Sequence, residues 1–180
     1  MPPVFMNAKY EQAVSLIGDH TPLRRDCGEV CGKACCGTDD DGQGGVCLLP
    51  CEAESLEGRE WAEIAAGKGL PLLMCSGPCE RAARPFMCRI FPLAPYRNKY
   101  GEWDVRMDAR ARAVCPLAGG GMPALNSAFV SSVRQAVSRL AEWDEGNAFL
   151  EKMQEEEDLF RADRKEILRS VRGAGRRGQS

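Results

Sequence analysis

The chain has no apolar run long enough to cross a membrane and no recognisable export signal. Its first twenty residues, MPPVFMNAKYEQAVSLIGDH, lack a basic segment, a long apolar stretch and a small-residue cleavage site. No later stretch approaches the roughly 18 apolar residues that a membrane span needs. We therefore expect a cytoplasmic protein with no membrane partner, in a compartment where cysteine thiols stay reduced.

Basic charge and histidine are also scarce. The net charge is −2, whereas nucleic-acid-binding proteins usually carry a basic face, so we expect no nucleic-acid partner. His20 is the only histidine, and its place in Asp-His-Thr-Pro is more typical of a turn than of a metal ligand. No glycine-rich motif follows a convincing strand, so a nucleotide-like cofactor site is not indicated. The sequence identifies no catalytic residue, and whether the protein is an enzyme stays open.

Cysteine is the residue that this chain has in excess. Ten cysteines are present, nine of them between Cys27 and Cys88. Reduced thiols at this density indicate metal binding. Eight of them are enough for two four-thiolate sites, although the sequence does not determine how they divide, and a single site with the other thiols buried is the alternative. The eight candidate metal ligands are Cys27, Cys31, Cys35, Cys36, Cys75, Cys79, Cys88 and Cys115.

The spacing of the thiols suits zinc or iron, including an iron–sulfur cluster. Both kinds of centre take about four cysteine sulfurs displayed on turns or short helices. The adjacent pair Cys35 and Cys36 is better suited to two neighbouring sites or a polynuclear centre, because neighbouring side chains point apart. Cys47 and Cys51 are predicted to be core residues or a weak redox pair rather than ligands. A secreted protein stapled by disulfides is a minor alternative.

The predicted fold is mainly α with an irregular cysteine-rich metal-binding region, and small α+β elements are possible. We expect a single domain over residues 1–172, followed by a disordered tail over residues 173–180. Within the domain, the cysteine-cluster region covers about 24–118 and a helical region covers about 122–172.

Hydrophobic periodicity and turn residues predict the individual elements. Prolines at intervals between Pro71 and Pro95 exclude a long regular element there. A turn or kink is expected over 144–147, and Pro123 suits the first turn of a helix. Predicted helices cover 6–17, 52–67, 124–143 and 148–171, with a loop between Cys36 and Cys47, a short hairpin over 100–107, and a segment over 109–113 that could be helical or extended.

One segment combines charge and apolar residues beside a candidate ligand. It reads Arg-Pro-Phe-Met-Cys-Arg-Ile-Phe-Pro over residues 84–92. We expect Phe86, Ile90 and Phe91 to shield a metal site from solvent, and neighbouring arginines to offset the negative charge of its thiolates.

At these residues the chain resembles the zinc- or iron-chelating cysteine-cluster proteins named for a CxxCxxCC motif and often called YkgJ-type. The same domain is associated with the flagellin lysine N-methylases of some bacteria. In this chain three residues separate Cys27 from Cys31, and three separate Cys31 from Cys35. The family name implies two residues between successive cysteines. The resemblance covers roughly Cys27 to Leu117 and rests on Cys27…Cys31-Gly-x-x-Cys35-Cys36, Leu48-Leu49-Pro50-x-Glu52, Cys79…Arg84-Pro85-x-x-Cys88-Arg89-x-Phe91-Pro92 and Cys115-Pro116-Leu117.

Three functions are compatible with these observations. The leading hypothesis is a cysteine-ligated metal-binding protein that holds zinc, iron or an iron–sulfur cluster and acts as an accessory or redox-type protein. The resemblance implies an alternative, an enzyme similar to a peptidyl-lysine N-methylase. A second alternative is a structural zinc protein that presents its helices to a protein partner whose identity the sequence does not indicate.

Overall fold

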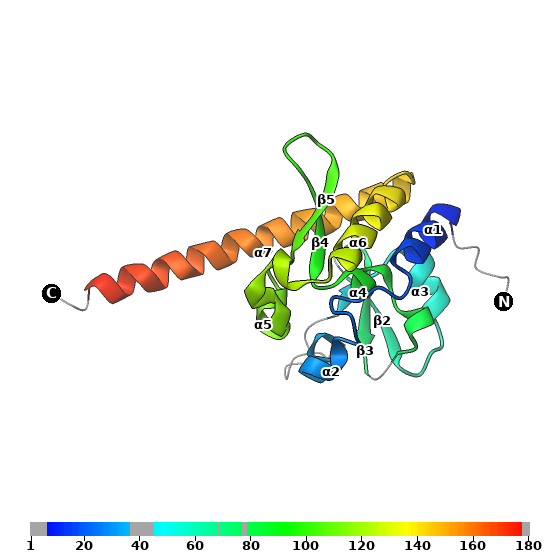
Figure 1. The fold of residues 1–180 in the computed structure, drawn as a ribbon, viewed down its shortest axis with the longest axis horizontal. Coiled ribbons are helices and arrows are strands. Elements are labelled where there is room, and N and C mark those ends of the chain that lie inside the picture. The colour runs from blue at the N-terminus through cyan, green and yellow to red at the C-terminus, as the bar shows by residue number, and fades with distance from the viewer. Residues whose placement is uncertain (1–6, 37–44, 68, 77–78, 178–180) are drawn as a thin grey trace.

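A computed structural model describes residues 7–36, 45–67, 69–76 and 79–177, with the backbone alone for 170–177 (Figure 1). The fold is α+β and mainly helical, with two small antiparallel sheets, as the sequence predicts. The helices are α1 (Ala8–Ile17), α2 (Gly28–Cys31), α3 (Pro50–Leu56), α4 (Phe86–Ile90), α5 (Ala111–Val114), α6 (Ser127–Leu140) and α7 (Asp144–Arg177), with 3₁₀ turns η1 (Ala34–Cys36), η2 (Arg81–Ala83), η3 (Pro116–Gly120) and η4 (Met122–Ala124). The strands are β1 (Val46–Cys47), β2 (Ala62–Ala66), β3 (Pro71–Cys75), β4 (Leu93–Arg97) and β5 (Trp103–Met107).

The main hydrophobic core lies where α1, α4, α6 and α7 meet the β4–β5 hairpin. In α1, the buried residues Tyr10, Ala13 and Ile17 recur every three or four positions, which places them on one face, and that face packs against α6. Phe86 and Ile90 of α4 are fully buried in the same core. The core therefore fixes α4, the helix that carries Cys88.

The helix predicted over 52–67 is wrong in its second half. Helix α3 ends at Leu56, Gly58 has a left-handed φ of 78°, and Ala62–Ala66 forms strand β2 instead. Strand β2 pairs with β3 along its whole length, from Ala62 opposite Cys75 to Ala66 opposite Pro71. This ladder, and the packing of Ile64 on a second small core, outweigh the helical propensity of the alanines. The sheet order is β1-β3-β2.

The predicted hairpin near Gly101 is confirmed and is longer than expected. Strand β4 pairs with β5 around a turn in which the Asn98 side chain accepts hydrogen bonds from the backbone amides of Tyr100 and Glu102, at 2.9 and 3.1 Å. Its first strand begins at Leu93, inside the proline-rich segment. Pro95 fits there because β4 has only one partner strand in the described chain. Among the described residues between Pro71 and Pro95, no element exceeds five residues, as predicted.

The C-terminal helices are present with shifted ends. Helix α6 begins at Ser127 after the Asn126 cap, so Pro123 lies in η4 and not in the first helical turn. The helical structure is interrupted at residues 141–143, and α7 begins at Asp144. A turn was predicted over 144–147 instead. Acidic residues in a first helical turn interact favourably with the helix dipole. The ambiguous 109–113 segment contains α5.

Helix α7 continues to Arg177, beyond the predicted end at Val171 and into the segment predicted to be a disordered tail. In Figure 1 its C-terminal half projects away from the rest of the molecule. Residues 178–180 and most of the predicted loop between Cys36 and Cys47 lie outside the described ranges. Within those ranges no helix is long and apolar enough to cross a membrane.

Candidate metal centre

Nine of the ten cysteines line one cavity of about 380 Å³. That volume lies within the range of roughly 300–1,000 Å³ that small-ligand and cofactor sites occupy. All eight predicted ligands are among the nine, although they come from segments up to 88 positions apart in the chain. The lining thiols are Cys27, Cys31, Cys35, Cys36, Cys47, Cys75, Cys79, Cys88 and Cys115.

The first four thiols are carried by two short helical turns. Cys27 precedes α2 and Cys31 ends it, with the Cys31 thiol 3.7 Å from the Cys27 carbonyl oxygen. Gly32 and Lys33 then both adopt positive φ, 60° and 62°, which reverses the chain into η1. Glycine adopts this conformation freely, whereas for lysine it is uncommon. After this reversal the chain forms η1, whose two cysteines, Cys35 and Cys36, line the cavity.

The remaining predicted ligands approach from other parts of the fold. Cys75 ends β3, Cys79 lies in the loop before η2, Cys88 lies in the middle of α4, and Cys115 directly follows α5. Burial raises the pKa of Cys88 to about 12, and nearby acidic groups, Glu52 first, add to that effect. In the absence of a cation this thiol therefore stays protonated at neutral pH.

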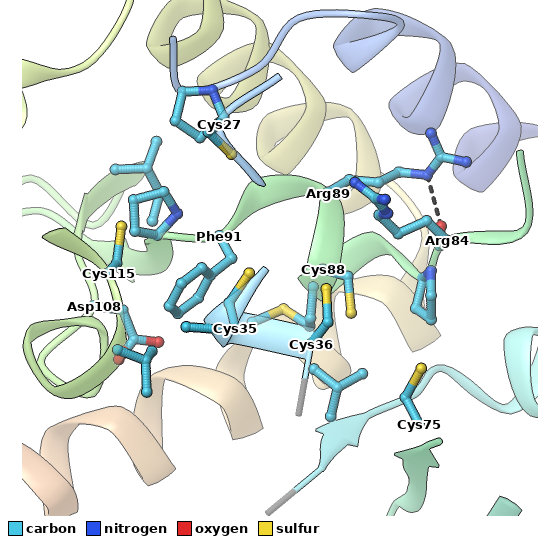
Figure 2. Close-up of a pocket in the computed structure, with 18 of the residues that line it drawn as sticks. Cys27, Cys35, Cys36, Cys75, Arg84, Cys88, Arg89, Phe91, Asp108 and Cys115 are labelled. Carbon is cyan, nitrogen blue, oxygen red and sulfur yellow. Dashed lines mark hydrogen bonds between the residues drawn. The ribbon is translucent and has the colours of Figure 1, made fainter. Parts of the chain in front are cut away.

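The Arg-Pro-x-x-Cys-Arg segment forms a hydrogen-bonded wall of the cavity. The Arg89 guanidinium donates to the carbonyl oxygen of Arg84 at 2.7 Å (Figure 2). It also donates to the carbonyl oxygens of Arg81 at 2.8 Å and Ala82 at 2.9 Å. These bonds hold the η2 turn against α4. The Arg84 side chain then bonds to the Cys79 thiol and adds positive charge beside it.

A buried carboxylate fixes the start of the helix that carries Cys88. Glu52 is 1% exposed and accepts hydrogen bonds from the amides of Leu49 at 2.9 Å and Phe86 at 2.6 Å, and from the Tyr10 hydroxyl at 2.8 Å. Burial raises the pKa of Glu52 above its ordinary value, and these three donors oppose that rise. Glu52 therefore joins α1 and α3 to α4. Sequence reasoning noted this residue in a motif and missed its role.

The adjacent pair in η1 shares one proton. The Cys35 thiol hydrogen-bonds to Cys36, which lowers the pKa of Cys36 to about 6; burial opposes this, and Arg84 and Lys33 assist it. The same bond, together with burial, raises the pKa of Cys35. These interactions favour the thiolate form of Cys36, which is the form that binds metal. Both residues are exposed, so they lie on the solvent side of the cavity.

The shielding residues differ in part from the prediction. Phe91 lines the cavity, as expected (Figure 2). Phe86 and Ile90 do not, because they lie on the face of α4 that packs into the main core. Met87 is the α4 residue that contributes apolar surface to the cavity in their place. His20 also lines the cavity rim, while its amide bonds the Ile17 carbonyl oxygen in the expected turn.

Cys47 and Cys51 have different surroundings. Cys47 lines the cavity, with its sulfur 3.7 Å from a carboxylate oxygen of Glu156, and burial raises its pKa to about 11. Cys51 does not line the cavity and packs against the main core. Its position agrees with the prediction of a core residue. It is also the natural control for experiments on the other thiols.

The residues fit a thiolate centre in number, kind and location, but their sulfurs are not drawn together. Among the described residues, which include all ten cysteines, no three Cys, His, Asp or Glu side chains are arranged to hold a metal ion. A tetrahedral zinc–thiolate site requires sulfurs about 3.8 Å apart, which follows from Zn–S bonds of about 2.3 Å. Thiols are weak donors and acceptors, so without a cation little attracts them to one another.

One unpaired donor supports a further ligand in the cavity. The Arg84 Nε is buried and has no hydrogen-bond partner among the described residues. Buried polar groups are nearly always paired, with protein groups or ordered water, so this donor is available to an acceptor beside the Cys79–Cys88 wall. A metal-bound thiolate would be such an acceptor.

Comparison with known proteins identifies no relative of this chain. No family model, no curated protein and no solved structure matches it. The resemblance to the cysteine-cluster proteins therefore rests on the motifs alone, and the geometry of the cavity is what bears on function.

Proposed function

We propose that this chain is a cysteine-ligated metal-binding protein, which holds zinc, iron or an iron–sulfur cluster and acts as an accessory or redox-type protein. The observation that carries the proposal is the convergence of nine thiols from distant segments on one cavity. Free cysteines packed for their bulk alone would have no reason to share one cavity. A reducing compartment such as the cytoplasm would keep them available as ligands.

The ligands would be the eight predicted cysteines, with Cys47 at the edge of the set. Bound zinc would cross-link the irregular half of the chain, and bound iron would add electron transfer. Arg84 would offset part of the thiolate charge and donate to a ligand sulfur. Arg89 and Glu52 would hold the two segments that present Cys79 and Cys88.

The experiment that tests the proposal is metal and acid-labile sulfide analysis of protein purified without oxygen. We expect zinc or iron bound through sulfur, with metal–sulfur distances of about 2.3 Å by X-ray absorption for zinc. Cys88→Ser should lower the metal content, whereas Cys51→Ser, outside the cavity, should keep it. Wild-type protein that is folded, fully reduced and free of metal would refute the proposal.

A structural zinc protein that presents a helix to a protein partner is the second candidate. One observation favours it: α7 projects from the body with large apolar side chains exposed, among them Leu159 at 66% and Phe160 at 41%. Zinc without redox chemistry would favour this candidate over the first. Nothing in the described residues favours the methylase-like enzyme, and we do not propose it.

A further inference from the structure

The cysteines around the cavity fall into two groups by their position in the fold. Cys27 precedes α2 and Cys31 ends it, and Cys115 follows α5, which packs against η1. In Figure 2, Cys27 and Cys115 lie toward one end of the cavity, and Cys75 lies toward the other. The cysteines are thus arranged along the cavity rather than in one ring around it.

Apart from the Cys35–Cys36 hydrogen bond, which spans the two groups, interactions among the thiols agree with this division. Cys27 interacts electrostatically with Cys31 and Cys115, and Cys35 interacts with Cys31 and Cys27 in addition to its neighbour. At the other end, Cys88 interacts with Cys36 and Cys79.

The adjacent pair lies at the boundary between the groups. The Cys35 and Cys36 thiols hydrogen-bond to each other, but a 3₁₀ turn rotates successive side chains by about 120°, so the two sulfurs can turn to opposite sides once that bond is given up. In Figure 2, Cys36 lies beside Cys88, whereas Cys35 lies toward Phe91. Each of the two can therefore serve the group on its own side.

We propose that the cavity holds two separate four-thiolate sites, one formed by Cys27, Cys31, Cys35 and Cys115 and the other by Cys36, Cys75, Cys79 and Cys88. This assignment rests on the proposed metal-binding function and divides its ligands. Cys75 joins the second site because it lies at that end of the cavity and precedes Cys79 by four residues. Cys47 belongs to neither site, because burial and the neighbouring Glu156 carboxylate both favour the protonated form of its thiol.

The two sites differ in the charges that surround them. Four thiolates around a divalent ion leave a net charge of −2. Arg84 bonds Cys79 and lies near Cys36 and Cys88, so the second site has a cation at its wall. The acidic Asp26 instead lies near Cys27 and, together with burial, opposes negative charge there. The second site should therefore keep its ion longer when a chelator is added.

Paired serine substitutions test this division. Full-length protein is reduced, loaded with zinc alone and desalted, and zinc per chain is measured. We expect about two ions in the wild type and in Cys51→Ser, one in Cys27→Ser/Cys115→Ser and in Cys79→Ser/Cys88→Ser, and about none in Cys88→Ser/Cys115→Ser. Zinc kept in a same-site double variant also reports that the variant folds, and circular dichroism checks the cross-site variant. Cobalt(II) loading adds a spectroscopic measure of each thiolate site.

Two results would overturn the division. If same-site and cross-site double variants lose zinc equally, the thiols form one indivisible centre. If Cys27→Ser/Cys115→Ser keeps both ions, the first ligand set is wrong. If the wild type binds iron and sulfide in place of zinc, iron per chain is measured in the wild type and in the same variants. A wild type that binds neither metal refutes the proposed function itself, which separates that failure from failure of the division.

Discussion

Two buried carboxylates hold the segments that carry the cysteines. Glu52 joins α1, α3 and α4 through three hydrogen bonds. Glu157 of α7 is fully buried, accepts the Ala109 amide at 3.0 Å and pairs with Arg106 and Arg161. It therefore fixes α7 to the segment that leads from β5 toward the last cysteine. Each carboxylate supports the cavity without lining it.

Glu52 should make stability depend on pH. Burial favours its protonated form and raises its pKa, so its stabilising contribution is complete below the ordinary value of 4.5 and is lost as pH rises through the folded-state pKa. We expect the free energy of unfolding of the wild type to fall relative to that of Glu52→Gln as the pH rises above 4.5. Urea unfolding of both proteins across this range measures the difference, and titration of the cysteines cancels in it.

The exposed neighbour provides the control for that measurement. Glu54 lies two residues away on the solvent side of α3, so Glu54→Gln should show no such trend. A wild type that gains stability over Glu52→Gln as pH rises would contradict the prediction. It would mean that the three donors outweigh burial and lower the pKa.

Arg84 should strengthen metal binding without being a ligand. Replacement by glutamine removes the positive charge and the donor that bonds Cys79. Loss of such an outer contact typically lowers metal affinity about 10–100-fold. Competition with a chromophoric chelator measures the change. Arg59→Gln, at an exposed position outside the cavity, is the matched control, and equal affinities for the two variants would exclude this role.

At the scale of elements, the junction of α6 and α7 depends on one glycine. A methyl group at position 146 would collide with the Leu140 carbonyl oxygen and would lie 3.1 Å from two carbons of its side chain. Alanine ordinarily favours a helix over glycine by about 1 kcal/mol. Here the collision should dominate, because α7 would have to move away from α6.

We therefore expect Gly146→Ala to lower the free energy of unfolding by about 1–3 kcal/mol. Thermal or urea unfolding measures it. Gly119→Ala is the control, because a methyl group there meets no atom within 4 Å and its backbone is not left-handed, so its effect should stay within about 0.5 kcal/mol. A stabilised Gly146→Ala variant would show that propensity outweighs packing at this junction.

At the scale of the whole molecule, the proposed centre would link segments that have little other regular structure. The described residues 24–36, 76 and 79–84 contain only short helices and turns, and their cysteines would be tied to α4 and to the segment after α5. A ligand that binds only the folded state stabilises it by RT ln(1 + [L]/Kd), which is about 4 kcal/mol at 1,000 times Kd. Metal should therefore contribute substantially to the stability of this chain.

Chelation under reducing conditions should lower the midpoint of thermal unfolding, and added zinc or iron should restore it. The Cys88→Ser/Cys115→Ser variant, which removes a ligand from both proposed sites, should respond to neither treatment. Differential scanning calorimetry measures these midpoints, with Cys51→Ser expected to behave as the wild type. A wild-type midpoint that does not change on chelation would argue against a structural contribution from metal.

Much of the element content could be predicted from local patterns. The helix near 6–17, both C-terminal helices and the hairpin at Gly101 follow from periodicity and turn residues that lie close together in the sequence. Helix ends were less predictable. Asn126 caps α6, and packing against the rest of the fold moves the break before α7 to 141–143.

The candidate ligands could be selected from the sequence because cysteine is chemically distinctive and dense there. The sequence could not indicate which of these thiols share a cavity. Cys47 and Cys51, four positions apart, separate because Cys47 ends β1 while Cys51 lies on α3. The strand at 62–66 was missed for the same kind of reason, since its partner β3 determines it.

The sequence by itself determined the mainly helical character of the chain, the hairpin and the kind of chemistry available, because composition and short-range periodicity express these properties. Only the tertiary structure decided that nine thiols border one cavity, that Glu52 and Arg89 position its wall, and that Ala62–Ala66 is a strand. These features depend on contacts between segments tens of residues apart. Their free energies arise when the chain folds, so no local pattern encodes them.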